Sequence, residues 1–277
     1  RAALDIKQAQ LPPGHPTVLS TAQALAAALG QQQKFDDALP LLEQVVAGQR
    51  KLTGPDSDVT AFAEHELAVA QRDAGYTSEA LVNYRRSMAT YAQVQGPRTI
   101  SVAISLNNIA GAENSLGDPA AEQSFRESLA IRRERLPAGD VSIARAEASL
   151  ARWLLARERL AEARPLVAQA GATRAAKLAP DHGDRVDSVL LDAQLALAER
   201  RLPEADTLLT GLEASEGTLR TGLRIERWRL LGDLCAVQGR HADAAAWHGK
   251  ALQLHLAKIG PRHPDTARRQ LALAQAQ

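Results

Sequence analysis

One small residue recurs along this chain at an almost constant interval. The residue is alanine, and consecutive copies lie 39 to 42 residues apart, at Ala38, Ala80, Ala121, Ala163, Ala205 and Ala244. Each copy stands early in a predicted helix. A period of this length is typical of a helical hairpin that is repeated and stacked, so that neighbouring hairpins bury one another's apolar faces. The interval therefore predicts an all-α fold, a solenoid of stacked antiparallel helix pairs.

The same pattern predicts where the repeats begin and end in what we expect to be a single solenoid. The spacing of Ala3 and His15 matches that of Ala251 and His263, so residues 1–15 are interpreted as the tail of a preceding repeat. We accordingly expect the chain to be a fragment of a longer protein. The predicted repeats span about residues 16–56, 57–97, 98–139, 140–182, 183–219 and 220–263, and residues 264–277 form a final helix.

Composition and charge limit the classes of partner. The 33 Lys and Arg residues nearly balance the 32 Asp and Glu residues, whereas proteins held by phosphate contacts usually carry a basic excess. We therefore expect no nucleic-acid partner. No apolar run of about 18 residues occurs, which predicts no membrane insertion. The single Cys235 excludes an intramolecular disulfide and leaves the compartment open, with the cytoplasm preferred and the periplasm the alternative if a membrane span precedes this fragment.

The hairpin has a recognisable internal pattern of helix A, turn and helix B. In the sixth repeat, helix A carries Trp228, Leu231 and Gly232, and helix B carries Ala244 and Trp247. Earlier A helices keep a small residue in the place of Gly232, namely Ala26, Ala68, Ala110, Ala151 and Ala193. The pattern resembles the tetratricopeptide repeat, in which small residues let the two helices approach closely. HEAT-like repeats share the period and are the alternative fold.

The loops between repeats indicate which type of tetratricopeptide repeat the chain resembles. Gly54-Pro55, Gly96-Pro97 and the segment 260–265 occupy the same phase, where Gly ends one helix and Pro begins the next. Together with residues 105–110 and 128–133, these loops resemble the 42-residue repeats of the kinesin light chain type. That resemblance implies a right-handed superhelix and a role in protein interactions. Bacteria use such repeats in signalling proteins, and repeat arrays fused behind Ser/Thr protein kinases are the parent that the resemblance suggests first.

The fifth repeat departs from the pattern. Asp192 stands where Leu67 and Leu231 stand in other repeats, and the second helix runs into Ser215 and Gly217. Because a carboxylate and flexible residues weaken helix packing, we expect this repeat to be shorter or bent.

Residues that commonly carry chemistry are present but poorly spaced for it. His241, His248 and His255 are seven residues apart, which is about 10.5 Å along a helix and too far for one metal ion. His15, His182 and His263 fall in the loops and are interpreted as turn residues. Cys235 is interpreted as a small core residue. No phosphate-binding loop, nucleophile elbow or zinc-protease motif occurs, so we expect no catalytic residue, no metal site, no cofactor and no enzyme activity in this fragment.

The tetratricopeptide resemblance implies a binding surface, since in that family the A helices line a concave wall that holds extended peptides. The polar residues that the resemblance places on this wall are Gln23, His65, Arg72, Asn107, Asn108, Asn114, Arg145, Arg152, Gln194, Glu226, Arg229 and Asp233. Asn side chains can both donate to and accept from a peptide backbone, and Arg can pair with a carboxylate. An ordinary solvated polar face is the alternative interpretation of the same residues.

Three functional hypotheses follow. The first is a module that binds a protein or peptide segment and belongs to a multidomain bacterial signalling protein. The second is a receptor for a peptide or small ligand, in which binding tightens the superhelix and the fifth repeat acts as a hinge. The third is a structural scaffold or homo-oligomer joined through its terminal repeats.

Overall fold

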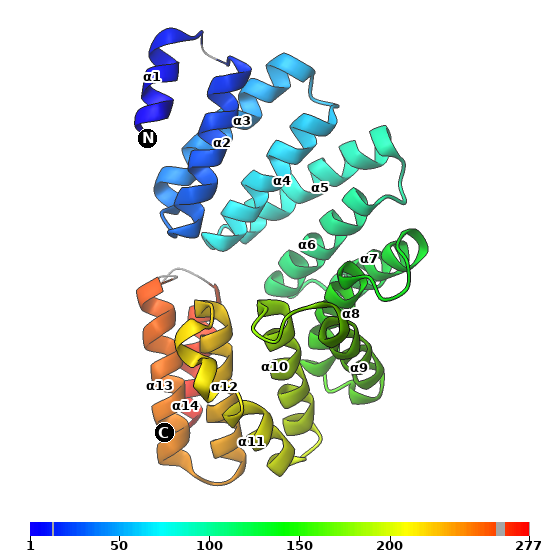
Figure 1. Cartoon of the computed structure of the whole chain (residues 1–277), viewed down its shortest axis with the longest axis vertical. Coiled ribbons are helices and arrows are strands. Elements are labelled where there is room, and N and C mark those ends of the chain that lie inside the picture. The colour runs from blue at the N-terminus through cyan, green and yellow to red at the C-terminus, as the bar shows by residue number, and fades with distance from the viewer. Residues whose placement is uncertain (13, 259–263, 277) are drawn as a thin grey trace. The chain divides into compact units, whose positions relative to one another are not determined.

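The computed structural model describes residues 1–12, 14–258 and 264–276 (Figure 1). Every regular element in that part of the chain is a helix, which confirms the all-α prediction. In chain order the elements are α1 (Ala2–Gln10), α2 (Pro16–Gln31), α3 (Phe35–Thr53), α4 (Asp58–Asp73), α5 (Thr77–Gln95), α6 (Ile100–Leu116), α7 (Ala121–Arg135), α8 (Val141–Leu155), α9 (Leu160–Lys177), α10 (Gly183–Ala198), α11 (Leu202–Thr210), the 3-10 helix η1 (Glu213–Thr218), α12 (Thr221–Val237), α13 (His241–Lys258) and α14 (Pro264–Ala276).

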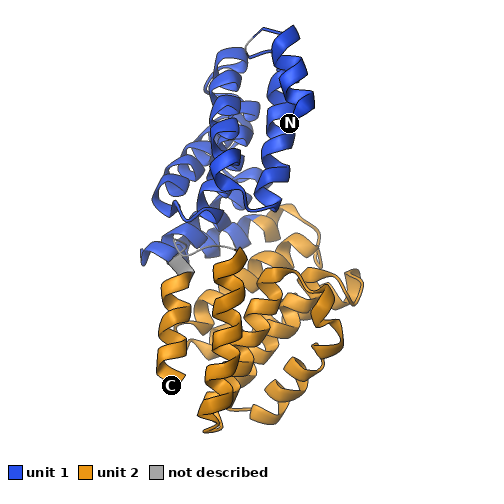
Figure 2. Cartoon of the chain, turned by 90° about the vertical axis from the view of Figure 1, so that its left-hand side faces the viewer, with its two compact units in different colours: residues 1–131 blue, residues 132–277 orange. Residues whose placement is uncertain are grey.

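The chain forms two compact units, residues 1–131 and residues 132–277 (Figure 2). In the first unit α2 pairs with α3 and α4 with α5, and the pairs stack through α3 on α4 and α5 on α6. In the second unit the pairs are α8 with α9, α10 with α11 and α12 with α13, and α14 packs on α13. Among the described helices, none combines the length and apolarity that crossing a membrane requires. We retain the predicted repeat spans as a proposal for where the repeats begin and end.

Short polar side chains fix where the A helices begin. Ser57 accepts a hydrogen bond from the Thr60 amide at the start of α4, and this satisfies one of the amides that a helix N-terminus leaves unpaired. His15 and His182 do the same through Nδ1 at the starts of α2 and α10. The prediction that these two histidines are turn residues is therefore confirmed, whereas His263 lies outside the described residues.

The periodic alanines lie where the helices of each pair meet. All six have 0% exposure: Ala38, Ala80, Ala121, Ala163, Ala205 and Ala244. The small residues of the A helices are equally shielded, and in the sixth pair a Cβ on Gly232 would lie 2.7 Å from the His248 ring. Because no space remains at these contacts, the side-chain size at each position sets the distance between the two helices. The predicted close helix approach is confirmed.

Buried glutamates bind successive helices to one another. Glu64 on α4 accepts from the Arg50 guanidinium of α3 at 2.5 Å, and Glu147 on α8 accepts from Arg133 of α7 at 2.8 Å. Both carboxylates are buried while both arginines are partly exposed. The arginine therefore reaches from the surface to compensate a charge that would be costly to bury alone.

The fifth helix pair has the shortened form that its sequence suggested. α11 has only 9 residues and is followed by the 6-residue helix η1. Arg227 of α12 lies beneath this junction at 2% exposure, donates from Nε to the Leu209 carbonyl at 2.8 Å and pairs with Glu216 of η1. One buried side chain thus holds the end of α11 and the following turn onto α12.

Asp192 of α10 should make the stability of this region depend on pH. Burial, helped by the charge of Glu204, raises the pKa of Asp192 from 3.8 to about 6. The folded protein thus binds this proton more tightly than the unfolded chain, so folding is penalised above about pH 6 and the penalty disappears below about pH 4. We expect Asp192→Asn to raise the melting temperature at pH 7.5 but not at pH 3.5.

Thermal unfolding followed by circular dichroism at the two pH values measures this effect. Asp206→Asn, on the exposed side of α11, is the matched control and should shift neither melting temperature. An equal gain at both pH values would show that packing, not the charge of Asp192, limits stability here.

Candidate functional site

In the first unit, three predicted wall residues form one hydrogen-bonded group. Asn108 on α6 donates from Nδ2 to His65 Nε2 on α4 at 3.1 Å, and its Oδ1 accepts from Arg72 at 3.4 Å. Burial and the nearby Arg72 charge lower the pKa of His65 to about 4. His65 is therefore neutral at physiological pH, with Nε2 as the acceptor. Asn108 therefore links the neighbouring helices α4 and α6.

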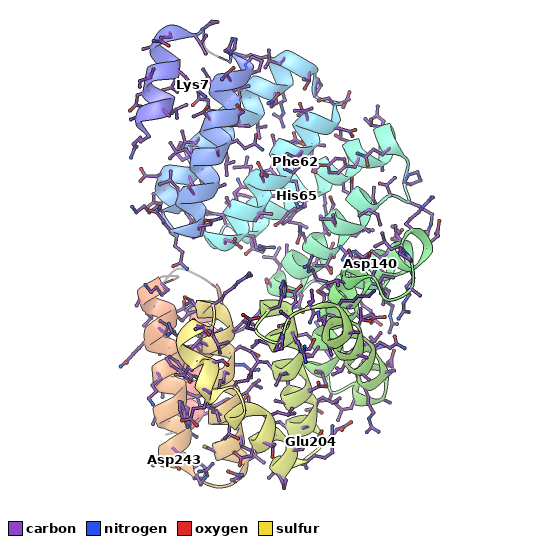
Figure 3. The ribbon with its side chains drawn as sticks, in the orientation of Figure 1. Lys7, Phe62, His65, Asp140, Glu204 and Asp243 are labelled. Atoms are coloured by element: carbon purple, nitrogen blue, oxygen red, sulfur yellow. The ribbon has the colours of Figure 1, made fainter. Side chains whose placement is uncertain are left out.

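Another predicted site residue, Gln23, forms a hydrogen bond between α2 and α4. Gln23 of α2 donates to Glu66 of α4 at 2.5 Å, and burial raises the pKa of Glu66 although this hydrogen bond opposes the shift. Beside it, a cavity of about 460 Å³ opens between α2 and α4. Phe62 lines the cavity and is 48% exposed, which is unusual for so large an apolar side chain. Figure 3 shows Phe62 and His65 on the same stretch of α4.

In the second unit, the predicted wall arginines already have partners within the chain. Arg145 on α8 pairs with Asp184 on α10 at 2.7 Å, and Arg152 pairs with Asp187 at 2.6 Å. These pairs bridge neighbouring A helices in the same way as Asn108 does in the first unit.

The predicted residues of α12 form a third group. Arg229 donates from Nε and Nη2 to the two carboxylate oxygens of Glu226 at 3.0 and 2.6 Å, and from Nη1 to Asp233 at 2.5 Å. Burial alone would raise the pKa of Glu226, but the positive charge of Arg229, with smaller contributions from Arg152 and Arg269, lowers it to about 2. Glu226 is thus a permanent anion held between arginines.

The remaining predicted residues take no part in these three groups as described. Asn107 and Asn114 on α6 and Gln194 on α10 are half-buried. The Oδ1 atom of Asn107 is buried without a hydrogen-bond partner within the described residues. Of the three asparagines that the sequence suggested, only Asn108 belongs to one of the groups described above.

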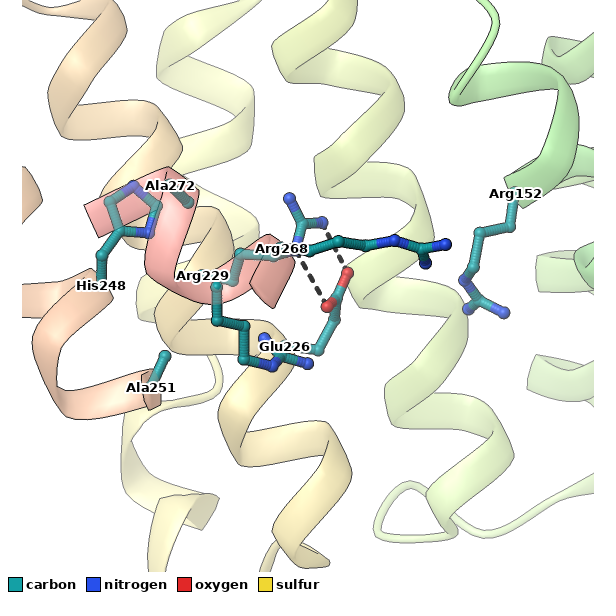
Figure 4. A pocket seen from close by; sticks show the side chains of 8 residues that line it. Arg152, Glu226, Arg229, His248, Ala251, Arg268 and Ala272 are labelled. Carbon is teal, nitrogen blue, oxygen red and sulfur yellow. Dashed lines mark hydrogen bonds and ion pairs between the residues drawn. The ribbon is translucent and has the colours of Figure 1, made fainter. Parts of the chain in front are cut away.

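Two features of the site were missed by sequence reasoning. Phe62 was missed because an apolar residue in an amphipathic helix is normally assigned to the core. Arg268 and Arg269 of α14 line a cavity together with Arg152 and Arg229 (Figure 4), and they were missed because only polar residues of the complete repeats were considered. Their place in the A helix of the next repeat was the signal that could have found them.

Side chains with reactive or metal-binding groups have structural roles here. Within the described residues, no three His, Cys, Asp or Glu side chains are arranged to hold a metal ion. Of the three histidines spaced by seven, His248 and His255 are buried in the helix packing and His241 is exposed. Cys235 is buried too, and burial raises the pKa of its thiol although the nearby Arg240 guanidinium opposes the shift.

Comparisons with known proteins agree with this geometry. Tetratricopeptide repeat family models match residues 17–93 and residues 231–265. A search of the curated proteins gave no match. The kinesin-light-chain-type repeats of Podosopora anserina are 28% identical and cover 74% of this chain and 97% of their own, with a TM-score of 0.61.

Two further solved structures share the fold at lower identity. A Rap protein complexed with Competence and Sporulation Factor is 14% identical over 99% of this chain and 80% of its own, with a TM-score of 0.67. The quorum sensor NprR from B. thuringiensis, in its apo form, is 13% identical over 93% of this chain and 76% of its own, with a TM-score of 0.61. The fold that these matches share is typically non-catalytic and serves protein–protein interaction. With its buried small residues and stacked helix pairs, this chain contains tetratricopeptide repeats, matched at residues 17–93 and 231–265, and has the fold of a tetratricopeptide repeat solenoid.

Proposed function

We propose that this chain binds an extended polypeptide segment of a partner along its A helices, as a recruiting or sensing module of a bacterial signalling protein and without catalysis of its own. The observation that carries the proposal is the cavity between α2 and α4, with half-exposed Phe62 in its wall. A large aromatic side chain left in water at an open cavity is more typical of a binding surface than of a core.

The chemistry of the cavity fits an extended segment. Phe62, Val69 and Ala26 make part of its lining apolar, which suits one apolar side chain of the partner. Gln23 and Glu66 also line it, and beyond the hydrogen bond that they share, the amide and the carboxylate have further capacity to pair with backbone groups on either side of that side chain. An apolar anchor surrounded by polar partners is the usual design of peptide-binding grooves.

Proteins of similar fold support the proposal that this chain binds a ligand. The Rap protein was solved with Competence and Sporulation Factor bound, and NprR is a quorum sensor. Both are similar to this chain in fold alone, so they support a capacity to hold a ligand and not the identity of that ligand.

The test is selection of peptides from a displayed random library, followed by affinity measurement for the best binders by fluorescence anisotropy. Phe62→Ala should weaken binding at least tenfold, since truncating a central aromatic anchor costs more than about 1.4 kcal/mol. Val82→Ala is the matched control, because Val82 is 57% exposed on α5, away from the cavity. Selected peptides that bind both variants equally would place the binding surface elsewhere.

A further inference from the structure

The cavity between α2 and α4 offers charge of one sign only. Among the described residues, its lining contains the carboxylates of Glu66 and Asp73 and no lysine or arginine, while His65 is neutral. Residues three or four positions apart lie next to one another on a helix. Four α4 residues of the lining recur at such intervals and so share one face of the helix, namely Phe62, Glu66, Val69 and Asp73. That face therefore presents an aromatic ring, a carboxylate, a valine and a second carboxylate in a row.

The two carboxylates differ in how their charge is compensated. Asp73 accepts from Nε and Nη2 of Arg72 at 3.0 and 2.8 Å, so its charge already has a counterion. Glu66 has a single partner among the described residues, the neutral amide of Gln23, which donates to Oε2 at 2.5 Å. A neutral amide satisfies a hydrogen bond but leaves the negative charge in place. Within the described lining, Glu66 is therefore the one charged group that no opposite charge compensates.

Partial burial makes this uncompensated charge sensitive to what enters the cavity. Burial raises the pKa of Glu66, and the hydrogen bond from Gln23 opposes that shift. Where water is partly excluded, a cation beside a carboxylate is attracted more strongly than it is in bulk water, and a second anion is repelled more strongly. The charge of Glu66 therefore favours a cationic guest and disfavours an acidic one.

The aromatic ring beside this carboxylate suits the same guest. Phe62 lies one helical turn before Glu66 and is 48% exposed, so much of its ring is available for contact (Figure 3). Lysine and arginine combine an apolar stem, which covers apolar surface, with a cationic end that is attracted to aromatic faces and carboxylates. The cavity volume of about 460 Å³ lies within the range of ligand pockets, roughly 300–1,000 Å³, so a basic side chain fits beside an apolar one.

We infer that the cavity between α2 and α4 selects a basic partner segment, in which a lysine or arginine stands beside the apolar residue that enters the cavity. The cationic group pairs with Glu66, and the stem of the same side chain lies against Phe62. The inference rests on the proposed function for the location of the segment and adds the charge that the segment must carry. Segments with Asp or Glu at this place are rejected, because they bring a second negative charge to Glu66.

Two displayed peptide libraries test the preference for a basic segment. One library omits Lys and Arg, the other omits Asp and Glu, and both are otherwise random. We expect the library without acidic residues to yield the tighter binders in fluorescence anisotropy. Glu66→Gln should weaken these binders roughly fivefold, because it removes the charge while the new amide oxygen still accepts from Gln23. Added sodium chloride should weaken binding to the parent chain more than binding to the variant.

Synthetic copies of the best peptide locate the partner of Glu66. Citrulline in place of arginine, or norleucine in place of lysine, removes the positive charge and keeps the length of the side chain. We expect this replacement to weaken binding to the parent chain but to cause little further loss in Glu66→Gln, since the two changes remove the same ion pair.

The matched control is Glu79→Gln, which removes one negative charge from the exposed surface of α5 and should leave peptide binding unchanged. Far-ultraviolet circular dichroism and melting curves verify that each variant is folded. Equally tight binders from the library without Lys and Arg, or equal losses in Glu66→Gln and Glu79→Gln, would overturn the inference. If those binders still depend on Phe62, the proposed function stands and only the charge preference fails. If neither library yields a peptide that depends on Phe62, both proposals fail.

Discussion

Replacing Ala26 by leucine is expected to lower the free energy of unfolding by about 1–3 kcal/mol, the usual cost of overpacking a filled core. Ala26 of α2 is 1% exposed and belongs to the same core cluster as Ala38 and Leu42 of α3. Ala26 also lines the cavity between α2 and α4, but at 1% exposure its side chain leaves no room on the side of the core that it shares with α3. A leucine that presses on this core must separate the two helices or leave its preferred rotamers.

Ala28→Leu is the matched control for this substitution. Ala28 lies two residues further along α2 and is exposed, so a leucine at that position meets solvent and helix propensity is nearly unchanged. Urea unfolding of both variants and the parent chain gives the comparison directly. Equal stability of the two variants would contradict the claim that small residues set the distance between paired helices.

Replacing Arg227 by alanine is expected to cost about 3 kcal/mol, because the change removes a buried charged side chain and leaves its partners unsatisfied. The Leu209 carbonyl would lose the bond from Arg227 Nε at 2.8 Å, and Glu216 would lose its guanidinium partner. We expect amide hydrogen exchange to increase across α11 and η1 more than in α8 and α9, since Arg227 connects that segment to α12.

Arg220→Ala is the control for this second substitution. Arg220 is the exposed residue before α12 and its side chain makes no cap hydrogen bond. Its removal should change the free energy of unfolding by less than about 0.5 kcal/mol, as is usual at the surface. Similar exchange rates in α11 for both variants would show that the short fifth pair is held by contacts other than Arg227.

The architecture was predictable because packing imposes it on the sequence. A helix pair that must approach closely needs a small residue at the contact, and the same contact recurs in each repeat, so Ala38 and its equivalents recur too. The exception at Asp192 was equally visible, because a carboxylate in a position otherwise held by leucine cannot pack in the same way. Both features depend only on which residue type stands at a fixed position of the repeat, and this can be read from the sequence.

The candidate sites were less predictable, because they depend on which side chains meet across helices. The sequence placed Arg145 and Arg152 on a wall but did not reveal that Asp184 and Asp187, one repeat later, pair with them. Similarly, His65 was a candidate by position alone, and its neutral state follows only from its burial and from Arg72. Charged residues that pair between repeats have the same spacing in the sequence as charged residues on a solvated helix face. The sequence alone therefore does not distinguish the two.

The most direct test of the account is a crystal structure of the chain with its best selected peptide. We predict that the peptide lies in an extended conformation along α2 and α4, with an apolar side chain against Phe62 and backbone groups near Gln23 and Glu66. A peptide bound only to the outer helices α3 and α5, with the cavity between α2 and α4 left open, would contradict the proposal that the A helices form the binding surface.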